Sequence, residues 1–277
     1  MPSLAVAGGQ LDYELIDMTP PWLREPQAVL FHHGIGTDMG IWASWLPALA
    51  AQFRLVRFSM RGFGGSSLPA ADFAWTLDSF SDDLIALADA AGIERFHLIA
   101  ESFGGTVSLN TALARPERVN SLTLLSTPHR GASVRPVAAW PALTASAAGM
   151  RQWNQEMMIG RFTDTSLAPA ARRWFQGVQE ETSPEVLRQL AGLISRTDLT
   201  PLLSRLHVPA LLMSGDASPY VGLEQVALLH KLLPASRVQI FPAARHGIAF
   251  SHPAQCVRAF TCFVAGLSGP SHPEETP

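Results

Sequence analysis

The sequence predicts an α/β protein with a doubly wound, mostly parallel eight-stranded sheet and a helical cap inserted after the sixth strand. Short apolar runs rich in branched residues alternate with amphipathic stretches along most of the 277 residues. Residues 131–197 interrupt this alternation with a pattern that is helical throughout. The composition, 47% hydrophobic and 16% charged, is that of one compact unit with a large core.

The apolar runs have the length of buried strands, whereas residues 11–17 alternate as a strand with one exposed face. Strands that carry helices on both faces are continuously apolar, because both faces are buried. The predicted buried strands are Ala28–His33, Leu55–Phe58, Phe96–Ala100, Ser121–Leu125, Ala210–Ser214 and Val238–Phe241. Helices are expected between them at Ser79–Ala91, Gly104–Arg115, Leu223–Leu233 and Pro253–Leu267.

The expected organisation is a core made of residues 1–130 and 198–267, with residues 131–197 as its cap. A cap that covers a sheet edge must supply part of the wall of any pocket there. Residues 268–277 are polar and include three prolines, which predicts a flexible tail.

Composition also narrows the kinds of partner and location. Twenty basic and 23 acidic residues leave a formal net charge of −3, which is not the single-sign field that attracts nucleic acid or anionic membranes. We therefore expect a small-molecule substrate, with no nucleic acid and no membrane; the composition leaves the oligomeric state open. The first 17 residues show no secretion signal. Cys256 and Cys262 are expected to be buried free thiols, which favours a cytoplasmic location.

The segment from Phe96 to Gly105 predicts a nucleophile. An apolar strand ends at Ser102 and a helix follows, with the small residues Ala100 and Gly104 two positions before and after the serine. A serine hydroxyl that attacks a carbonyl must project from a tight strand-to-helix turn, and small flanking residues let neighbouring backbones approach. The alternative is a serine that caps the helix and has no chemical role.

At these residues the chain resembles the α/β-hydrolase superfamily, over about residues 11 to 267. The segment Phe31–Asp38 is similar to the family's loop after the third strand, and the resemblance implies that the backbone N–H groups of Ile35 and Phe103 form an oxyanion hole. The segment Met60–Ser66 is similar to the family's arginine-glycine turn, which we interpret as scaffold.

The segment Ala244–Pro253 implies that His246 is the base, because it follows the last strand at the edge where the nucleophile also lies. Relatives carry the triad acid three residues after the glycine that ends strand seven, and here that position is Ser218. We expect Asp216 to replace it if the loop bends differently. Asp38, Glu101 or an unassisted histidine are the alternatives, and Asp216 could instead cap its own turn.

The run from Gly34 to Trp42, and the cap segments Ala171–Phe175 and Glu181–Glu185, are most similar to 3-oxoadipate enol-lactonases. The resemblance implies hydrolysis of a small carboxylated ester or lactone through a Ser-His acyl-enzyme with an atypical or displaced acid. The alternatives of the same fold are a cofactor-free C–C hydrolase, a heteroaromatic-ring oxygenase and a catalytically silent binding protein.

Substrate contacts are expected from His33, Trp140, Arg161 and Trp174. An arginine suits a substrate carboxylate because its guanidinium binds both oxygens at once; the cap arginines considered are Arg151, Arg161, Arg172 and Arg173. No cofactor and no metal are expected, because the histidines lack the spacing of metal ligands and no dinucleotide fingerprint is complete.

Overall fold

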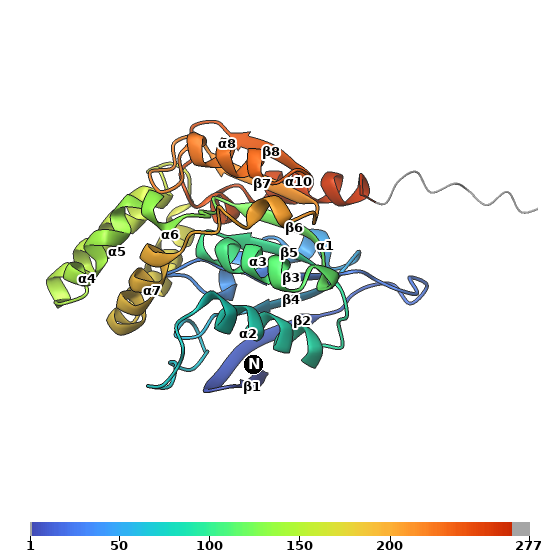
Figure 1. The fold of residues 1–277 in the computed structure, drawn as a ribbon, viewed down its shortest axis with the longest axis horizontal. Helices are drawn as coiled ribbons and strands as arrows, with labels where there is room; N and C mark the ends of the chain where they lie inside the picture. Colours follow the sequence, from blue (N-terminus) through green and yellow to red (C-terminus); the bar gives the residue numbers. More distant parts are fainter. Residues whose placement is uncertain (1, 268–277) are drawn as a thin grey trace, which may run out of the picture.

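The predicted fold class is confirmed by the computed structural model, which describes residues 2–267 and contains an eight-stranded sheet with helices on both faces (Figure 1). The strand order is β1-β2-β4-β3-β5-β6-β7-β8. β1 (Ser3–Val6) and β2 (Gly9–Ile16) pair antiparallel, as do β2 and β4, and the remaining neighbours are parallel. The predicted tail, 268–277, lies outside the described residues.

Each of the six predicted buried strands is present within two residues of its expected bounds. Successive side chains of a strand point to opposite faces, so Val29 and Phe31 of β3 pack into one hydrophobic core and Leu30 into the other. The helices of both faces therefore cover the central strands. These strands are β3 (Ala28–His32), β4 (Arg54–Phe58), β5 (Phe96–Glu101), β6 (Val119–Leu125), β7 (Ala210–Gly215) and β8 (Ser236–Phe241).

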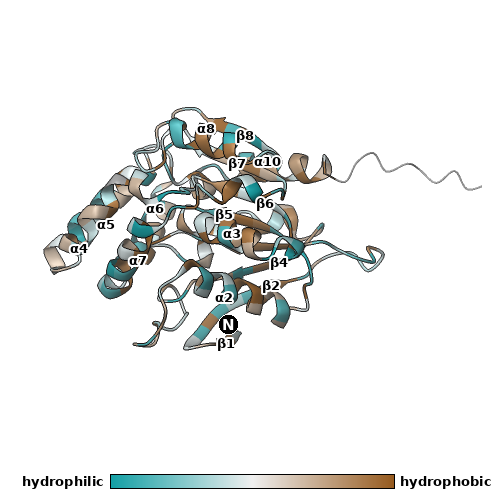
Figure 2. Cartoon of the chain, viewed as in Figure 1, coloured by the Kyte–Doolittle hydropathy of each residue, from teal (hydrophilic) through white to brown (hydrophobic). Residues whose placement is uncertain are grey.

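The helices that follow the strands lie in two layers. On one face, α2 (Leu77–Ala90), α3 (Phe103–Ala114) and α8 (Leu223–Leu232) contribute to one core. On the other face lie α1 (Leu46–Leu49), α9 (Ile248–Ser251) and α10 (Pro253–Ala265). Figure 2 shows the central strands as largely hydrophobic between these layers. Within residues 2–267, no helix is long and apolar enough to cross a membrane.

Between β6 and β7 the chain forms helices that lie together at one side of the molecule (Figure 1). We call residues 131–197 the insertion. Its two ends are joined, because Gly131 N–H donates to Thr197 O at 2.9 Å and Leu199 N–H to His129 O at 3.0 Å. Its elements are the 3₁₀ turns Gly131–Ser133 and Arg135–Ala139, α4 (Trp140–Leu143), α5 (Ala147–Arg161), α6 (Pro169–Glu180) and α7 (Pro184–Arg196).

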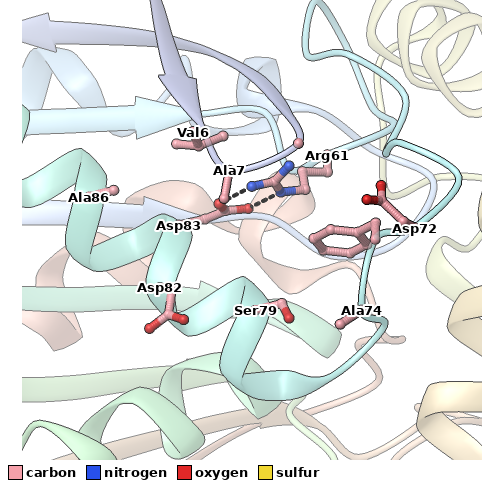
Figure 3. A pocket seen from close by; sticks show the side chains of 11 residues that line it. Val6, Ala7, Arg61, Asp72, Ala74, Ser79, Asp82, Asp83 and Ala86 are labelled. Atoms are coloured by element: carbon pink, nitrogen blue, oxygen red, sulfur yellow. Dashed lines mark hydrogen bonds and ion pairs between the residues drawn. The ribbon is translucent and has the colours of Figure 1, made fainter.

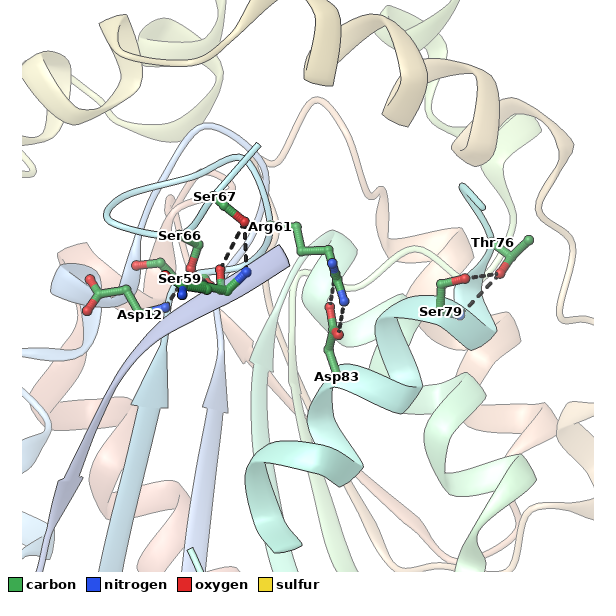
Figure 4. A network of polar contacts seen from close by, with 9 residues as sticks. Asp12, Ser59, Arg61, Ser66, Ser67, Thr76, Ser79 and Asp83 are labelled. Carbon is green, nitrogen blue, oxygen red and sulfur yellow. Dashed lines mark hydrogen bonds and ion pairs between the residues drawn. The ribbon is translucent and has the colours of Figure 1, made fainter. Parts of the chain in front are cut away.

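The arginine-glycine turn after β4 is bound to α2 by a buried ion pair. Arg61 donates to both carboxylate oxygens of Asp83, at 2.5 and 2.6 Å, whereas the neighbouring Asp82 is exposed (Figure 3). Ser66 holds the other end of the turn by donating to Ser59 O at 2.6 Å and accepting from Asp12 N–H at 2.9 Å (Figure 4). Removing one partner of a buried pair costs about 3–5 kcal/mol because it leaves the other charge unpaired, so Arg61 and Asp83 depend on each other.

The two cysteines of α10 differ in exposure. Cys256 is buried and Cys262 is exposed, and both are free. The expectation that both thiols are buried is therefore wrong for Cys262. The two cysteines are six positions apart, which puts their side chains on different faces of the helix, and one of those faces is toward solvent.

Candidate active site

Ser102 stands in a sharp turn between β5 and α3. Its backbone has φ 54° and ψ −122°, a conformation that costs a non-glycine residue about 1–3 kcal/mol and persists where neighbours hold it. Its N–H donates to Leu125 O at 2.9 Å, which fixes the turn to β6. Gly104 allows the close approach, because a Cβ there would lie 2.5 Å from both His32 Nδ1 and His33 O. Ala100, at the position of the first glycine of the common Gly-x-Ser-x-Gly motif, is fully buried within β5.

His246 lies in the loop after β8, and the structure brings its ring to Ser102. The Nε2 atom is 3.0 Å from Ser102 Oγ, within hydrogen-bond distance. The imidazole is buried, and burial together with the charge of Arg161 lowers the pKa of His246 to about 3. The ring is therefore neutral near pH 7 and can accept the hydroxyl proton.

The other ring nitrogen, Nδ1, is 3.1 Å from Ser218 Oγ. The structure does not bring Asp216 to the imidazole, because its side chain is exposed. Two backbone hydrogen bonds explain this: Asp216 N–H donates to Phe241 O at 3.2 Å and Ala217 N–H to Ala244 O at 3.0 Å. They hold the loop after β7 against the loop after β8, so the ordinary acid position, Ser218, faces the ring. The expectation that Asp216 supplies the triad acid is corrected accordingly.

The other acidic candidates do not take this place. Asp38 caps the 3₁₀ turn after β3 by accepting from Gly40 N–H at 2.7 Å. Glu101 is buried beside Ser102, and burial raises its pKa to about 7 although the nearby charge of Arg161 opposes the rise. Among residues 2–267, no carboxylate hydrogen-bonds the His246 ring.

A serine at this position orients the ring less strictly than a carboxylate would. A carboxylate can only accept, so it forces the proton onto Nδ1 and leaves Nε2 free to accept, whereas a hydroxyl can accept or donate. Ser218 Oγ already accepts from Val221 N–H at 3.2 Å, which leaves one lone pair for Nδ1–H. Ser218 also adds no negative charge to stabilise an imidazolium.

Two further residues of the cavity wall, Ile35 and Phe103, have backbone amides that are candidate donors in the site. Phe103 is the first residue of α3, so its N–H has no intrahelical partner. Ile35 lies in the loop after β3 and lines the same cavity. In the part of the chain that the structure describes, neither amide donates to another protein group. Both are therefore free to donate to a ligand.

His33 does not contact this cavity, contrary to expectation. Its Nε2 accepts from Met60 N–H at 2.7 Å, so the ring proton is on Nδ1, which donates to Gly34 O at 2.7 Å. Burial lowers the pKa of His33 to about 4, and the ring is neutral. His33 thus joins the turn after β4 to the loop that carries Ile35, which is a structural role.

A narrow cavity of about 30 Å³ opens above Ser102 and His246. Of the expected substrate contacts, Trp140 and Arg161 line it. Trp174 does not: it is 40% exposed and stacks on Phe250 with ring centroids 5.4 Å apart, because its face of α6 points outward. The remaining wall is mostly apolar and consists of Ile35, Phe103, Pro128, Val134, Val137, Met157, Ile194, Tyr220 and Val221.

Arg161 brings a buried positive charge to this cavity. It ends α5 and donates to Gln179 Oε1 of α6 and to the carbonyl oxygen of Ile35. Both acceptors are neutral, and burial lowers the pKa of Arg161. The other arginines that we considered lie elsewhere: Arg151 and Arg173 are exposed, and Arg172 donates to Thr163 O.

The sequence interpretation missed Tyr220 and Gln179. The edge of the Tyr220 ring lies against the His246 ring, with centroids 4.9 Å apart and an interplanar angle of 88°. Gln179 is fully buried and accepts from Arg161. The spacing of Tyr220 from Ser218 was an available signal, because both belong to the loop that faces the histidine. A single sequence gives no comparable sign that Gln179 is buried.

A hydroxyl, a neutral imidazole and two free amides around one mostly apolar cavity can carry out acyl transfer. Comparison with known proteins agrees with this chemistry. The model of the alpha/beta hydrolase fold family matches residues 27–253. The chain belongs to this family.

Its relatives include esterases and lactonases, and also a 2-hydroxymuconate semialdehyde hydrolase of Pseudomonas. The chain is 29% identical to a pimeloyl-[acyl-carrier protein] methyl ester esterase of Aeromonas hydrophila, over 86% of this chain and 95% of that protein. It is 22% identical to 3-oxoadipate enol-lactonase 1 of Acinetobacter baylyi, over 87% and 89%. The enol-lactonase of Burkholderia xenovorans superimposes with a TM-score of 0.84 at 23% identity, over 95% and 100%. These matches confirm the predicted similarity to enol-lactonases, and the chain is a hydrolase of the α/β fold.

The two acid positions can be separated by a pair of variants. We expect Ser218→Asp to raise kcat for ester hydrolysis at least about tenfold, because neutralising the acid of a triad in serine proteases lowers kcat by about 10⁴. Asp216→Asn should leave kcat within about twofold, as for other exposed side chains. Steady-state kinetics on one activated ester measures both. A large loss in Asp216→Asn, with no gain in Ser218→Asp, would restore Asp216 as the acid.

Proposed function

We propose that the protein hydrolyses small carboxylated esters or lactones through an acyl-enzyme on Ser102, with His246 as the base and Ser218 in the place of the triad acid. The observation that carries this proposal is the 3.0 Å contact between Ser102 Oγ and His246 Nε2. Ile35 and Phe103 also line the cavity at this contact, and within residues 2–267 their amides donate to no protein group.

In the first half of the proposed reaction, His246 Nε2 takes the proton of Ser102 as Oγ attacks the acyl carbon. The amides of Ile35 and Phe103 donate to the oxygen that becomes negative, and such donors typically lower the barrier by about 3–4 kcal/mol each. The imidazolium then gives its proton to the departing alkoxide. In a lactone the leaving oxygen stays attached to the acyl chain.

In the second half, His246 takes a proton from water, which attacks the acyl carbon of Ser102. The tetrahedral intermediate collapses, Ser102 Oγ leaves, and the imidazolium returns its proton to that oxygen. Ser218 accepts a hydrogen bond from Nδ1–H but does not balance the charge of the imidazolium. We therefore expect turnover below that of a triad with a carboxylate.

Arg161 supports a carboxylated substrate. It is the buried cation of the described cavity wall. It donates hydrogen bonds to the side-chain amide oxygen of Gln179 and to the backbone carbonyl oxygen of Ile35. A substrate carboxylate would add the charge-assisted hydrogen bond that these neutral acceptors do not give. The apolar remainder of the wall and the narrow space favour a small acyl group. The enol-lactonase relatives, whose name describes a lactone of an oxo acid, agree with this class.

The insertion is proposed to act as the cap of this enzyme. Trp140, Met157 and Arg161 from the insertion meet Ser102 and His246 from the core around one cavity. A cap that closes the site excludes water from the attacking and leaving groups, which strengthens the electrostatic interactions there. The boundaries 1–130, 131–197 and 198–267 follow from this role.

Labelling with a fluorophosphonate tests the nucleophile. We expect one adduct on Ser102 in the wild type, no adduct in Ser102→Ala, and a much slower reaction in His246→Ala, because the hydroxyl then lacks its base. Intact-mass and peptide mass spectrometry measure the adduct. Absence of labelling in the folded wild type would favour a silent binding protein or a reaction without acyl transfer.

A matched pair of substrates tests Arg161. Arg161→Met should lower kcat/KM for the monomethyl ester of a short dicarboxylic acid about 10- to 100-fold more than for the dimethyl ester, because a hydrogen bond to a charged group contributes about 1.5–3 kcal/mol. The ratio of the two losses is informative, since damage to the Ile35 loop would affect both esters alike. Equal losses would remove Arg161 as the carboxylate receptor.

A further inference from the structure

The last turn of α5 lies against the loop that carries His246. The final carbonyl groups of a helix have no intrahelical partner. Here Gly160 O accepts from His246 N–H at 3.3 Å and Arg161 O accepts from Gly247 N–H at 3.2 Å. The insertion therefore binds the backbone of the histidine itself.

The side chain of Arg245 adds hydrogen bonds between the histidine loop and the end of α5. Its Nη1 donates to Ile159 O and, at 3.4 Å, to Phe162 O. Arg245 is half-buried and lies outside the cavity wall. Together with the two backbone amides, it pairs four consecutive carbonyls at the end of α5 with three consecutive residues of the histidine loop.

The histidine ring is held from a second direction by a contact that also includes α5. Tyr220 lies edge-on to the ring and donates from its hydroxyl to Glu156 O at 3.1 Å. The contact depends on Gly160, because a Cβ at that position would lie 2.0 Å from the Tyr220 hydroxyl oxygen. The backbone and the ring of His246 are thus both fixed relative to the same helix.

This arrangement supplies one of the two things that Ser218 lacks. A triad carboxylate orients the imidazole and stabilises its positive charge. The hydrogen bonds at the end of α5 attach the histidine loop and thereby orient the ring. They do not balance the charge of an imidazolium, because burial and the charge of Arg161 in the same turn lower the pKa of His246.

We propose that the C-terminal turn of α5, bound through Arg245, is a positioning element that holds His246 in reach of Ser102 in a triad without an acid. The inference rests on the proposed function, because it concerns the base of that reaction. Arg245 acts through His246 and touches neither substrate nor reacting atoms. Docking of the insertion on the core is then a condition for an active base, in addition to its part in closing the cavity.

The test compares Arg245→Ala and Arg245→Lys in the wild type and in Ser218→Asp, with the exposed Arg258→Ala as the matched control. In the wild-type background we expect Arg245→Ala to lower kcat at least about tenfold with little change in KM, since small misplacements of a catalytic group cost up to about 100-fold. Arg245→Lys should recover part of the loss. In Ser218→Asp the loss should shrink to less than about threefold, because a carboxylate then orients the ring independently.

The same fold loss in both backgrounds, a change in KM alone, or an unchanged kcat in Arg245→Ala would overturn the inference. Circular dichroism and urea unfolding test whether each variant is folded. If Arg245→Ala does not fold, the same comparison is made with Arg245→Lys. Fluorophosphonate labelling of the same samples separates the two proposals. Labelling of Ser102 at equal rates in wild type and Arg245→Ala removes the positioning role alone, whereas no labelling in the wild type removes the proposed function and this inference with it.

Discussion

The hydrogen bond between the Ser102 hydroxyl and the His246 imidazole is the interaction on which the site depends. It joins residues 144 positions apart, so its geometry is set by the sheet and not by local sequence. The strained turn at Ser102 raises the hydroxyl above the end of β5. The loop after β8 delivers the imidazole to the same edge, as expected where parallel strands end together.

The charge distribution around this contact departs from that of a triad with a carboxylate. The partner of Nδ1 is the neutral Ser218. The charged group that acts on the ring is the guanidinium of Arg161, which adds to burial in lowering the pKa of His246. In the proposed function, the buried cation of Arg161 favours negative charge in the cavity, on the developing oxyanion and on a substrate carboxylate.

Much of the fold was predictable because buried parallel strands are continuous apolar runs and because the turn at Ser102 carries its own signature. The short β1 was not placed, since its four residues alternate weakly and pair only through the hairpin with β2. Asp216 failed as a prediction because backbone hydrogen bonds between the loops after β7 and β8 decide which side chain faces the ring. Trp174 failed because the orientation of α6 on the core, and not its own sequence, puts that ring outside.

Within residues 2–267, a neutral imidazole with no carboxylate partner lies beside the Ser102 hydroxyl. Nuclear magnetic resonance of protein labelled with ¹⁵N-histidine, titrated from pH 4 to pH 9 and assigned with His246→Gln, tests this neutral state directly. Since the pKa of His246 is lowered to about 3, its ring nitrogens should keep the shifts of neutral imidazole throughout the range. A His246 ring that becomes protonated near pH 6.5 or above would show that burial and Arg161 do not keep the imidazole neutral, and it would contradict the account.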